Sequence, residues 1–157
     1  MILKMANGMA DIVSPETRSR MMSSIRAKNT SPERIVRSIL HKAGFRYRLH
    51  SKNLPGTPDL VLSRYRIAIF VHGCFWHAHS CRFFRMPSSN REFWEKKISA
   101  NRDRDTKVMK KLLGAGWRVF IVWECALRGK RNFSDIGNQL ISWIGSDNQL
   151  GELSGEG

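Results

Sequence analysis

The sequence predicts an α/β protein in which a mixed β-sheet is flanked by helices. Short apolar runs rich in branched residues, typical of buried strands, occur at residues 60–62, 65–71 and 118–123. Longer segments with the helical spacing of apolar residues precede, separate and follow these runs. An order of helix, strands, long helix, strand and helix packs most simply as helices on a mixed sheet. The length of 157 residues allows one domain with a core of its own.

Composition divides the chain into three parts. We expect residues 1–16 to be a flexible leader and residues 17–144 to be the single folded domain. The domain begins with a basic, serine-rich arm over residues 17–29, which is either a short helix or a segment ordered by a partner. Residues 145–157 are polar and rich in glycine, so we expect a disordered tail. No apolar run has the length of a membrane span or a signal peptide.

The first helix is expected to begin at Thr30-Ser31-Pro32-Glu33. Thr30 and Glu33 have the spacing of a capping box, while Pro32 suits the first helical position after a Ser31 cap. Gly44 is placed to end the helix. The apolar residues between them share one face: Ile35, Val36, Ile39 and Leu40.

Two strands follow a turn at residues 55–58, which read PGTP. Asp59 leads directly into the first strand, residues 60–62. Residues 65–71 read YRIAIFV, and their length and branching predict a buried strand.

A long helix is predicted over residues 90–113, ending at Gly114. One of its faces carries six residues spaced by four and three: Trp94, Ile98, Asn101, Asp105, Val108 and Leu112. Asn101 and Asp105 interrupt this otherwise apolar stripe, so they either bond to neighbouring backbone or face a site. A strand over residues 118–123 and a closing helix over residues 134–144 complete the domain. The closing helix should turn four residues inward: Ile136, Leu140, Trp143 and Ile144.

The charge of the chain indicates a polyanionic partner. Lysine and arginine number 27 against 13 acidic residues, which gives a net charge of +14. The last part of the chain, residues 132–157, has no basic residue, so the positive charge lies in the body of the domain. We favour nucleic acid over a merely soluble basic protein. A membrane surface is a weaker alternative, since no basic amphipathic helix stands alone.

Residues 72–81, HGCFWHAHSC, have the densest chemistry. Two cysteines and a histidine from this segment, joined by Cys125, would complete a tetrahedral structural zinc site. Spacing leaves open which of His72, His77 and His79 is the ligand. An odd number of cysteines argues against a secreted disulfide framework and favours reduced thiols in a cytoplasm. The alternative is three buried thiols and scattered surface histidines.

Asp59 and the histidines also suggest metal-dependent hydrolysis. A carboxylate at a strand end suits Mg²⁺ held against a phosphate, and such an ion can activate water. His72 or His77 can exchange protons near neutral pH. The alternative is that Asp59 is a loop residue or cap and that the histidines are structural.

The aromatic residues Phe75 and Trp76 are unusual in a polar loop. They either join the core or act as wedges between base pairs, and Trp94 can belong to the same group. The basic charge favours wedges. Lys97 and Asn101 lie one helical turn apart and can reach one ligand together.

These motifs closely resemble the very-short-patch repair (Vsr) mismatch endonucleases. The matching stretches lie between residues 17 and 144, and two of them are highly specific. They read TRS at 17–19, PGTPD at 55–59, IFVHGCFWH at 69–77, EFW at 92–94 and GWRVFIVWECALRG at 116–129, with His79, Cys81 and the helix of Glu33.

The resemblance implies a restriction-endonuclease-like fold and a defined reaction. Members of the family nick duplex DNA on the 5′ side of the thymine in T·G mismatches, which arise when 5-methylcytosine deaminates. Mg²⁺ would be the catalytic metal, held by Asp59 and the backbone carbonyl of Val71. His72 and His77 match the active-site histidines, and Glu33 matches a supporting residue.

The resemblance also assigns the remaining residues. The structural zinc ligands would be Cys74, His79, Cys81 and Cys125. Phe75, Trp76 and Trp94 would intercalate beside the mismatch, Met22 would insert from the arm, and Lys97 and Asn101 would read the mismatched pair.

The resulting hypothesis is a cytosolic, monomeric bacterial enzyme acting on double-stranded DNA that contains a T·G mismatch. Mismatch-repair proteins and a repair polymerase would be its partners. Two alternatives stay open. The first is a restriction-type or structure-nonselective Mg²⁺-dependent nicking enzyme. The second is a zinc-stabilised DNA-binding module without catalysis.

Overall fold

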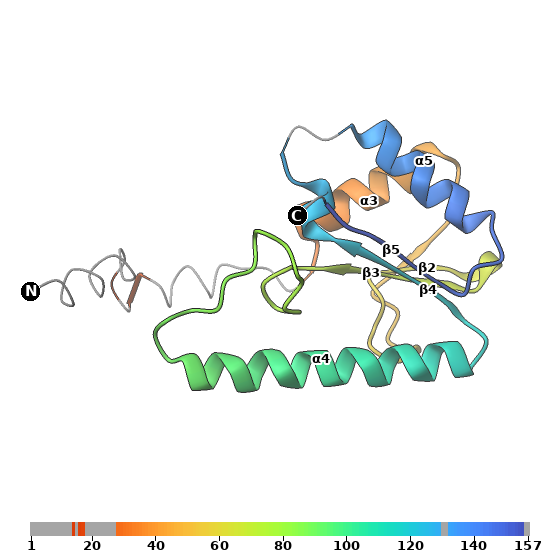
Figure 1. Cartoon of the computed structure of the whole chain (residues 1–157). Coiled ribbons are helices and arrows are strands. Elements are labelled where there is room, and N and C mark those ends of the chain that lie inside the picture. Colours follow the sequence, from red (N-terminus) through yellow and green to blue (C-terminus); the bar gives the residue numbers. More distant parts are fainter. Residues whose placement is uncertain (1–13, 15, 18–27, 130–131, 156–157) are drawn as a thin grey trace, which may run out of the picture.

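The computed structural model describes residues 14, 16–17, 28–129 and 132–155, and in this part a five-stranded sheet lies between helices (Figure 1). The predicted α/β class is therefore confirmed. The strands follow one another in sheet order: β1 (Arg48–Leu49), β2 (Leu60–Leu62), β3 (Ile67–His72), β4 (Arg118–Trp123) and β5 (Leu150–Leu153). The pairs β1–β2 and β2–β3 are antiparallel, and β3, β4 and β5 are parallel, so the sheet is mixed.

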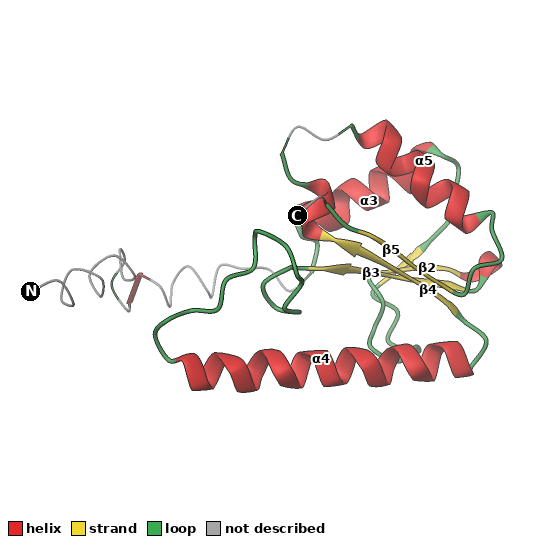
Figure 2. Ribbon diagram, in the orientation of Figure 1, coloured by secondary structure: helices red, strands yellow, loops and turns green. Residues whose placement is uncertain are grey.

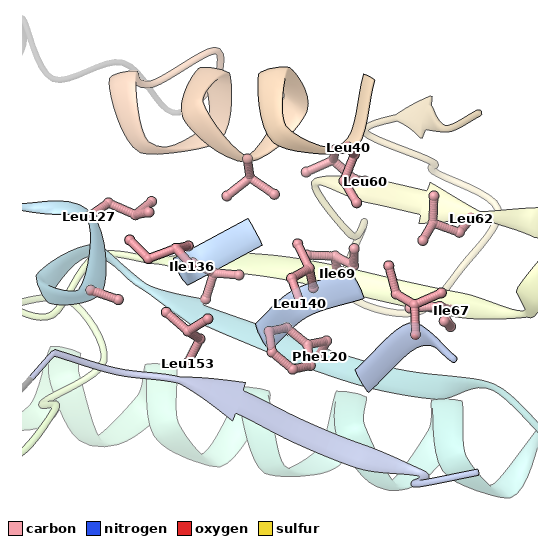
Figure 3. Packing of buried hydrophobic residues seen from close by; sticks show 14 residues of the cluster. Leu40, Leu60, Leu62, Ile67, Ile69, Phe120, Leu127, Ile136, Leu140 and Leu153 are labelled. Carbon is pink, nitrogen blue, oxygen red and sulfur yellow. The ribbon is translucent and has the colours of Figure 1, made fainter. Parts of the chain in front are cut away.

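Three helices cover the two faces of the sheet. Helices α3 (Ser31–Lys42) and α5 (Phe133–Ile144) lie on one face, and α4 (Arg91–Gly114) runs along the other (Figure 2). Residues of β3 and β4 alternate between two hydrophobic clusters, as the period of a strand requires. Ile69 and Phe120 pack under α3 and α5 (Figure 3), whereas Phe70 and Ile121 pack against α4.

Local sequence explains where α3 begins. Thr30 is the N-cap, and its Oγ1 accepts a hydrogen bond from the backbone N–H of Glu33. Of the two predicted starts, the Thr30 cap is the correct one, and Pro32 follows in the first turn. The Glu33 carboxylate bonds to the backbone N–H of Asn29 at 3.0 Å, one residue before the cap. The predicted inner face of the helix is confirmed, since Val36 and Leu40 are buried.

The stripe predicted on α4 is also confirmed. All six of its residues are buried or half-buried, and Ile98 and Leu112 are the fully buried members. Strand β3 departs slightly from the prediction, because residues 63–65 form a 3₁₀ turn and Arg66 takes a left-handed φ of 54°. The strand therefore begins at Ile67.

The expected disorder of residues 145–157 is wrong for the described part of that segment. Residues 150–153 form β5, which pairs in parallel with β4. The glycine content misled the prediction, because Gly151 serves close packing. A Cβ atom at Gly151 would lie 2.3 Å from Nε1 of Trp143 on α5. The expected leader and the arm of residues 17–29 lie almost wholly outside the described residues.

Arg118 ties β5 and α5 to the start of β4. Its guanidinium donates to the backbone carbonyls of Trp143, Ile144, Ser146 and Asn148 over 2.8–3.1 Å. It also lies 4.5 Å from the ring centroid of Trp143. One cation thus satisfies the carbonyl groups at the end of the helix and in the following loop.

Among the described residues, none of the helices has both the length and the apolar character that a membrane span requires.

We expect Arg118→Met to destabilise the protein by about 2–4 kcal/mol, because half-buried carbonyls lose a charged donor. Urea denaturation followed by circular dichroism measures this change. Arg102→Met, at an exposed position of α4, is the matched control and should change stability little. Equal effects of the two substitutions would contradict the role given to Arg118.

Candidate functional site

The candidate site lies where β2 begins and β3 and β4 end. Because β2 is antiparallel to β3, Asp59 just before β2 comes close to the end of β3. Its Oδ2 accepts a hydrogen bond from the backbone N–H of Val71 at 2.7 Å. A cleft of about 1220 Å³ opens at this edge, and its walls include Asp59, His72 and His77. The structure therefore brings together three residues that the sequence assigned to catalysis.

The surroundings of Asp59 compensate only partly for the burial of its negative charge. Burial raises its pKa to about 6, and the bond from Val71 opposes this change only partly. The neighbouring Glu33 carboxylate raises the pKa further. A bound cation would supply the missing positive charge, so the residue fits a hard metal ion chemically.

His72 and His77 form a stacked pair. Their ring centroids lie 3.8 Å apart and their planes differ by 5°. Burial lowers the pKa of His72 to about 3, with a smaller contribution from His77, while Asp105 acts in the opposite direction. His72 is therefore neutral in the free protein at neutral pH, and the approach of a phosphate would raise its pKa. Its Nδ1 is buried without a hydrogen-bond partner among the described residues.

The two polar residues of the α4 stripe have different roles. Asn101 donates from Nδ2 to the backbone carbonyl of Trp76 at 3.1 Å, so it fixes the loop after β3. Asp105 faces the site, where its Oδ2 is hydrogen-bonded to Nδ1 of His77. The sequence left open whether these residues bond to backbone or face a site; Asn101 does the first and Asp105 does the second. The polar interruption of the apolar stripe was the sequence feature that singled out Asp105.

A second group of side chains converges beside the first. The ligand atoms of Cys74, His79, Cys81 and Cys125 all lie within 4.8 Å of one another. Bonds of about 2.3 Å to sulfur and 2.0–2.1 Å to nitrogen at a tetrahedral angle separate S and N by about 3.6 Å. The observed distance from Sγ of Cys125 to Nδ1 of His79 is 3.5 Å. Among the three histidines, His79 is the one beside the cysteines, and the set fits a tetrahedral metal ion.

The surroundings of this cluster hold it against the sheet. Trp123, at the end of β4, stacks on the ring of His79 with centroids 4.1 Å apart. Its Nε1 donates to Oε2 of Glu152 in β5 at 2.9 Å. Beyond β5, the backbone N–H of Gly155 points to Sγ of Cys125 at 3.2 Å. The C-terminal strand therefore supports the cluster, a role that the sequence did not reveal.

The predicted wedge residues lie together on the loop and at the start of α4. The ring centroid of Phe75 lies 5.2 Å from that of Trp76 and 5.4 Å from that of Trp94. All three side chains are half-buried, so they are not part of the buried core, but they are also not fully exposed. Nζ of Lys97 lies 5.5 Å from the ring centroid of Trp76. Met22 lies outside the described residues.

A third group, next to Asp59, includes residues that sequence reasoning missed. Glu33 is buried and accepts a hydrogen bond from Nη2 of Arg37 at 3.0 Å. Its Oε2 lies 3.5 Å from Nε2 of His50, and Nδ1 of His50 lies 3.9 Å from Oδ1 of Asp59. His50 belongs to no motif, and only the pairing of β1 with β2 brings it here. The sequence therefore held no signal for it.

Comparison with known proteins identifies the family. The model of the family described as DNA mismatch endonuclease Vsr matches residues 10–83. The DNA mismatch endonuclease Vsr of Escherichia coli is 40% identical over 151 residues, covering 95% of this chain and 97% of that protein. The type II nicking enzyme V.XorIIP of Xanthomonas oryzae pv. oryzae is 50% identical over 129 residues, covering 82% and 90%. V.NmeAIP, a type II nicking enzyme of Neisseria meningitidis, is 44% identical over 136 residues, covering 87% and 97%. This chain belongs to the DNA mismatch endonuclease Vsr family.

Proposed function

We propose that this protein nicks duplex DNA on the 5′ side of the thymine in a T·G mismatch, the product of 5-methylcytosine deamination. Its family makes it a DNA endonuclease, and relatives with nicking activity in their names support single-strand cleavage. The observation that carries the proposal is the position of Asp59, His72 and His77 in one cleft with the aromatic residues Phe75 and Trp76. Chemistry on a phosphate and recognition of a weakened base pair would then occur side by side.

The proposed catalytic metal is Mg²⁺, held by Asp59 and the backbone carbonyl of Val71. The oxygen ligands and the raised pKa of Asp59 support a hard cation. When bound, the ion supplies an activated water and neutralises charge on the phosphate. Asp105 accepts at Nδ1 of His77, so Nε2 is the nitrogen left for the substrate. His72 is neutral but only a weak base in the free protein, because burial lowers its pKa to about 3. It would accept a proton only once a bound phosphate raises that pKa.

We propose that the second cluster holds a structural zinc ion through Cys74, His79, Cys81 and Cys125. The mutual distances of the ligand atoms, and the supply of all four donors by side chains, support a closed site. The mixed sheet also supports a restriction-endonuclease-like fold, since Asp59 directly precedes β2 and His72 and His77 lie at and after the end of β3.

Recognition would use the aromatic group. Phe75, Trp76 and Trp94 are proposed to enter the base stack beside the mismatch, where unstacking costs less than in paired DNA. Lys97 and Asn101 are proposed to read the mismatched pair, and Met22 to insert from the arm. The net charge of +14 supports sequence-independent binding to the DNA backbone.

The remaining assignments are proposals on the same basis. Double-stranded DNA with a T·G mismatch is the substrate, and mismatch-repair proteins and a repair polymerase are partners of a monomeric, cytosolic enzyme. The nicking enzyme without mismatch preference and the non-catalytic DNA-binding module are the alternatives that the next experiment separates.

The direct test compares nicking of two duplexes that differ only in a T·G or a T·A pair, with Mg²⁺ or with EDTA. Several flanking sequences are included. We expect a Mg²⁺-dependent cut on the 5′ side of the mismatched thymine, absent in Asp59→Asn and present in Asp103→Asn, an exposed control on α4. Equal cutting of both duplexes would favour a nicking enzyme without mismatch preference. Tight binding without cutting in any sequence would favour the non-catalytic module.

Asp59→Asn should also stabilise the metal-free protein above pH 6. The carboxyl titrates at about 6 in the folded state and at its ordinary value of 3.8 when unfolded. The folded protein thus retains a proton that the unfolded chain has lost, so wild-type stability falls as pH rises from 3.8 to 6. The Asn variant avoids this loss, which is at most about 3 kcal/mol.

Thermal denaturation in EDTA at pH 4 and pH 8 measures this difference. The variant should be more stable than wild type at pH 8 and nearly equal to it at pH 4. Added Mg²⁺ should stabilise only the wild type. A variant less stable than wild type at pH 8 would contradict the assigned burial cost.

A further inference from the structure

Three charged or titratable side chains form a chain that ends at Asp59. Glu33 binds Arg37, Arg37 binds His50, and His50 faces Asp59. Their side chains are mostly buried, with exposed fractions of 3% for Glu33, 16% for Arg37, 14% for His50 and 18% for Asp59. Such groups are rarely this buried unless they are paired. The proposed catalytic reaction uses neither Arg37 nor His50, so their burial needs another explanation.

Backbone pairing fixes where His50 stands. The residue follows β1, whose Leu49 lies opposite Leu60, and its backbone N–H donates to the carbonyl of Asp59 at 3.2 Å. Its φ of 47° lies in the left-handed region, which is uncommon for a residue other than glycine. The sheet thus holds the ring beside the carboxylate in a conformation that the chain does not adopt readily.

Arg37 determines which ring nitrogen of His50 carries the proton. Nη2 of Arg37 lies 3.2 Å from Nε2 of His50. A guanidinium group donates hydrogen bonds and never accepts them, so Nε2 is the acceptor in this contact. Oε2 of Glu33 lies farther from Nε2, at 3.5 Å, and already accepts from Asn29 and Arg37, so it competes less well for a proton on Nε2. In the neutral ring the proton is then on Nδ1, the nitrogen that lies 3.9 Å from Oδ1 of Asp59.

The same contact argues against His50 as a metal ligand. Glu33, His50 and Asp59 have atoms close enough to surround an ion. However, the lone pair of Nε2 is directed to Arg37, and Nδ1 carries a proton, so neither nitrogen can coordinate without breaking this arrangement. A cationic guanidinium beside the group also opposes a second ion there.

We propose that His50 is a positioning residue for Asp59, held in its Nδ1-protonated form by Arg37, which Glu33 anchors in turn. The inference rests on the proposed function, in which Asp59 holds the catalytic cation. The backbone N–H of Val71 fixes Oδ2 of Asp59. The ring Nδ1–H of His50 orients Oδ1 of Asp59 electrostatically across 3.9 Å. Partners that orient a ligating carboxylate commonly change metal affinity by about 10–100-fold.

Two readouts test the inference in the zinc-loaded, full-length protein. Long-range ¹H–¹⁵N spectra of protein labelled with ¹⁵N-histidine report the tautomer of His50, whose signals are identified by their loss in His50→Phe. We expect the proton on Nδ1 in the wild type and a change in the tautomer balance in Arg37→Met. Electron paramagnetic resonance reports the binding of Mn²⁺ in place of Mg²⁺. His50→Phe should weaken Mn²⁺ binding about 10–100-fold.

Further variants separate positioning from general damage. Asn at position 50 keeps a donor near the place of Nδ1, so His50→Asn should recover most of the Mn²⁺ affinity. His41→Asn, an exposed histidine of α3, should bind as the wild type does. A proton on Nε2 in the wild type would overturn the inference. It would also fail if His50→Phe bound Mn²⁺ normally while Asp59→Asn had lost binding. Normal binding by Asp59→Asn would refute the proposed cation site itself, and with it the role of His50.

Discussion

The proposed zinc site of Cys74, His79, Cys81 and Cys125 is the constraint on which the edge of the candidate cleft depends. The loop between β3 and α4 has no strand or helix of its own, yet it contains His77 and the aromatic residues Phe75 and Trp76. A zinc ion bound by these four residues, as we propose, would fasten this loop to the turn after β4, where Cys125 lies. Trp123 stacks on His79 and is itself bound by Glu152 of β5, so the C-terminal strand helps to position the cleft.

The site itself is built from groups whose preferred charge states are opposed by burial. Burial raises the pKa of Asp59 to about 6 and lowers that of His72 to about 3, so burial opposes the charged form of each group. A cation beside Asp59 and a phosphate beside His72 would reverse these preferences together. Shifted pKa values of this kind cluster at functional sites. Burial of apolar side chains in the two hydrophobic clusters of the sheet offsets the cost of burying these titratable groups.

Local patterns predicted the parts of the fold that have strong periodicity. The strands at residues 60–62 and 118–123 and the stripe on α4 follow directly from the spacing of apolar residues. Strand β5 was missed because its LGEL sequence is short and polar, and it is held by Arg118 and by packing on Trp143. His79 was separable from His72 and His77 only with the resemblance or the structure, since all three lie within eight residues. His50 depends on strand pairing, which spacing does not encode.

Zinc K-edge X-ray absorption of the purified protein tests the central constraint most directly. We expect one zinc ion per chain, coordinated by three sulfur atoms at about 2.3 Å and one nitrogen atom at about 2.0–2.1 Å. Cys125→Ser should lose this spectrum, because it removes the ligand that joins the loop to the turn after β4. Protein without zinc, or zinc in a shell of oxygen and nitrogen alone, would contradict the account.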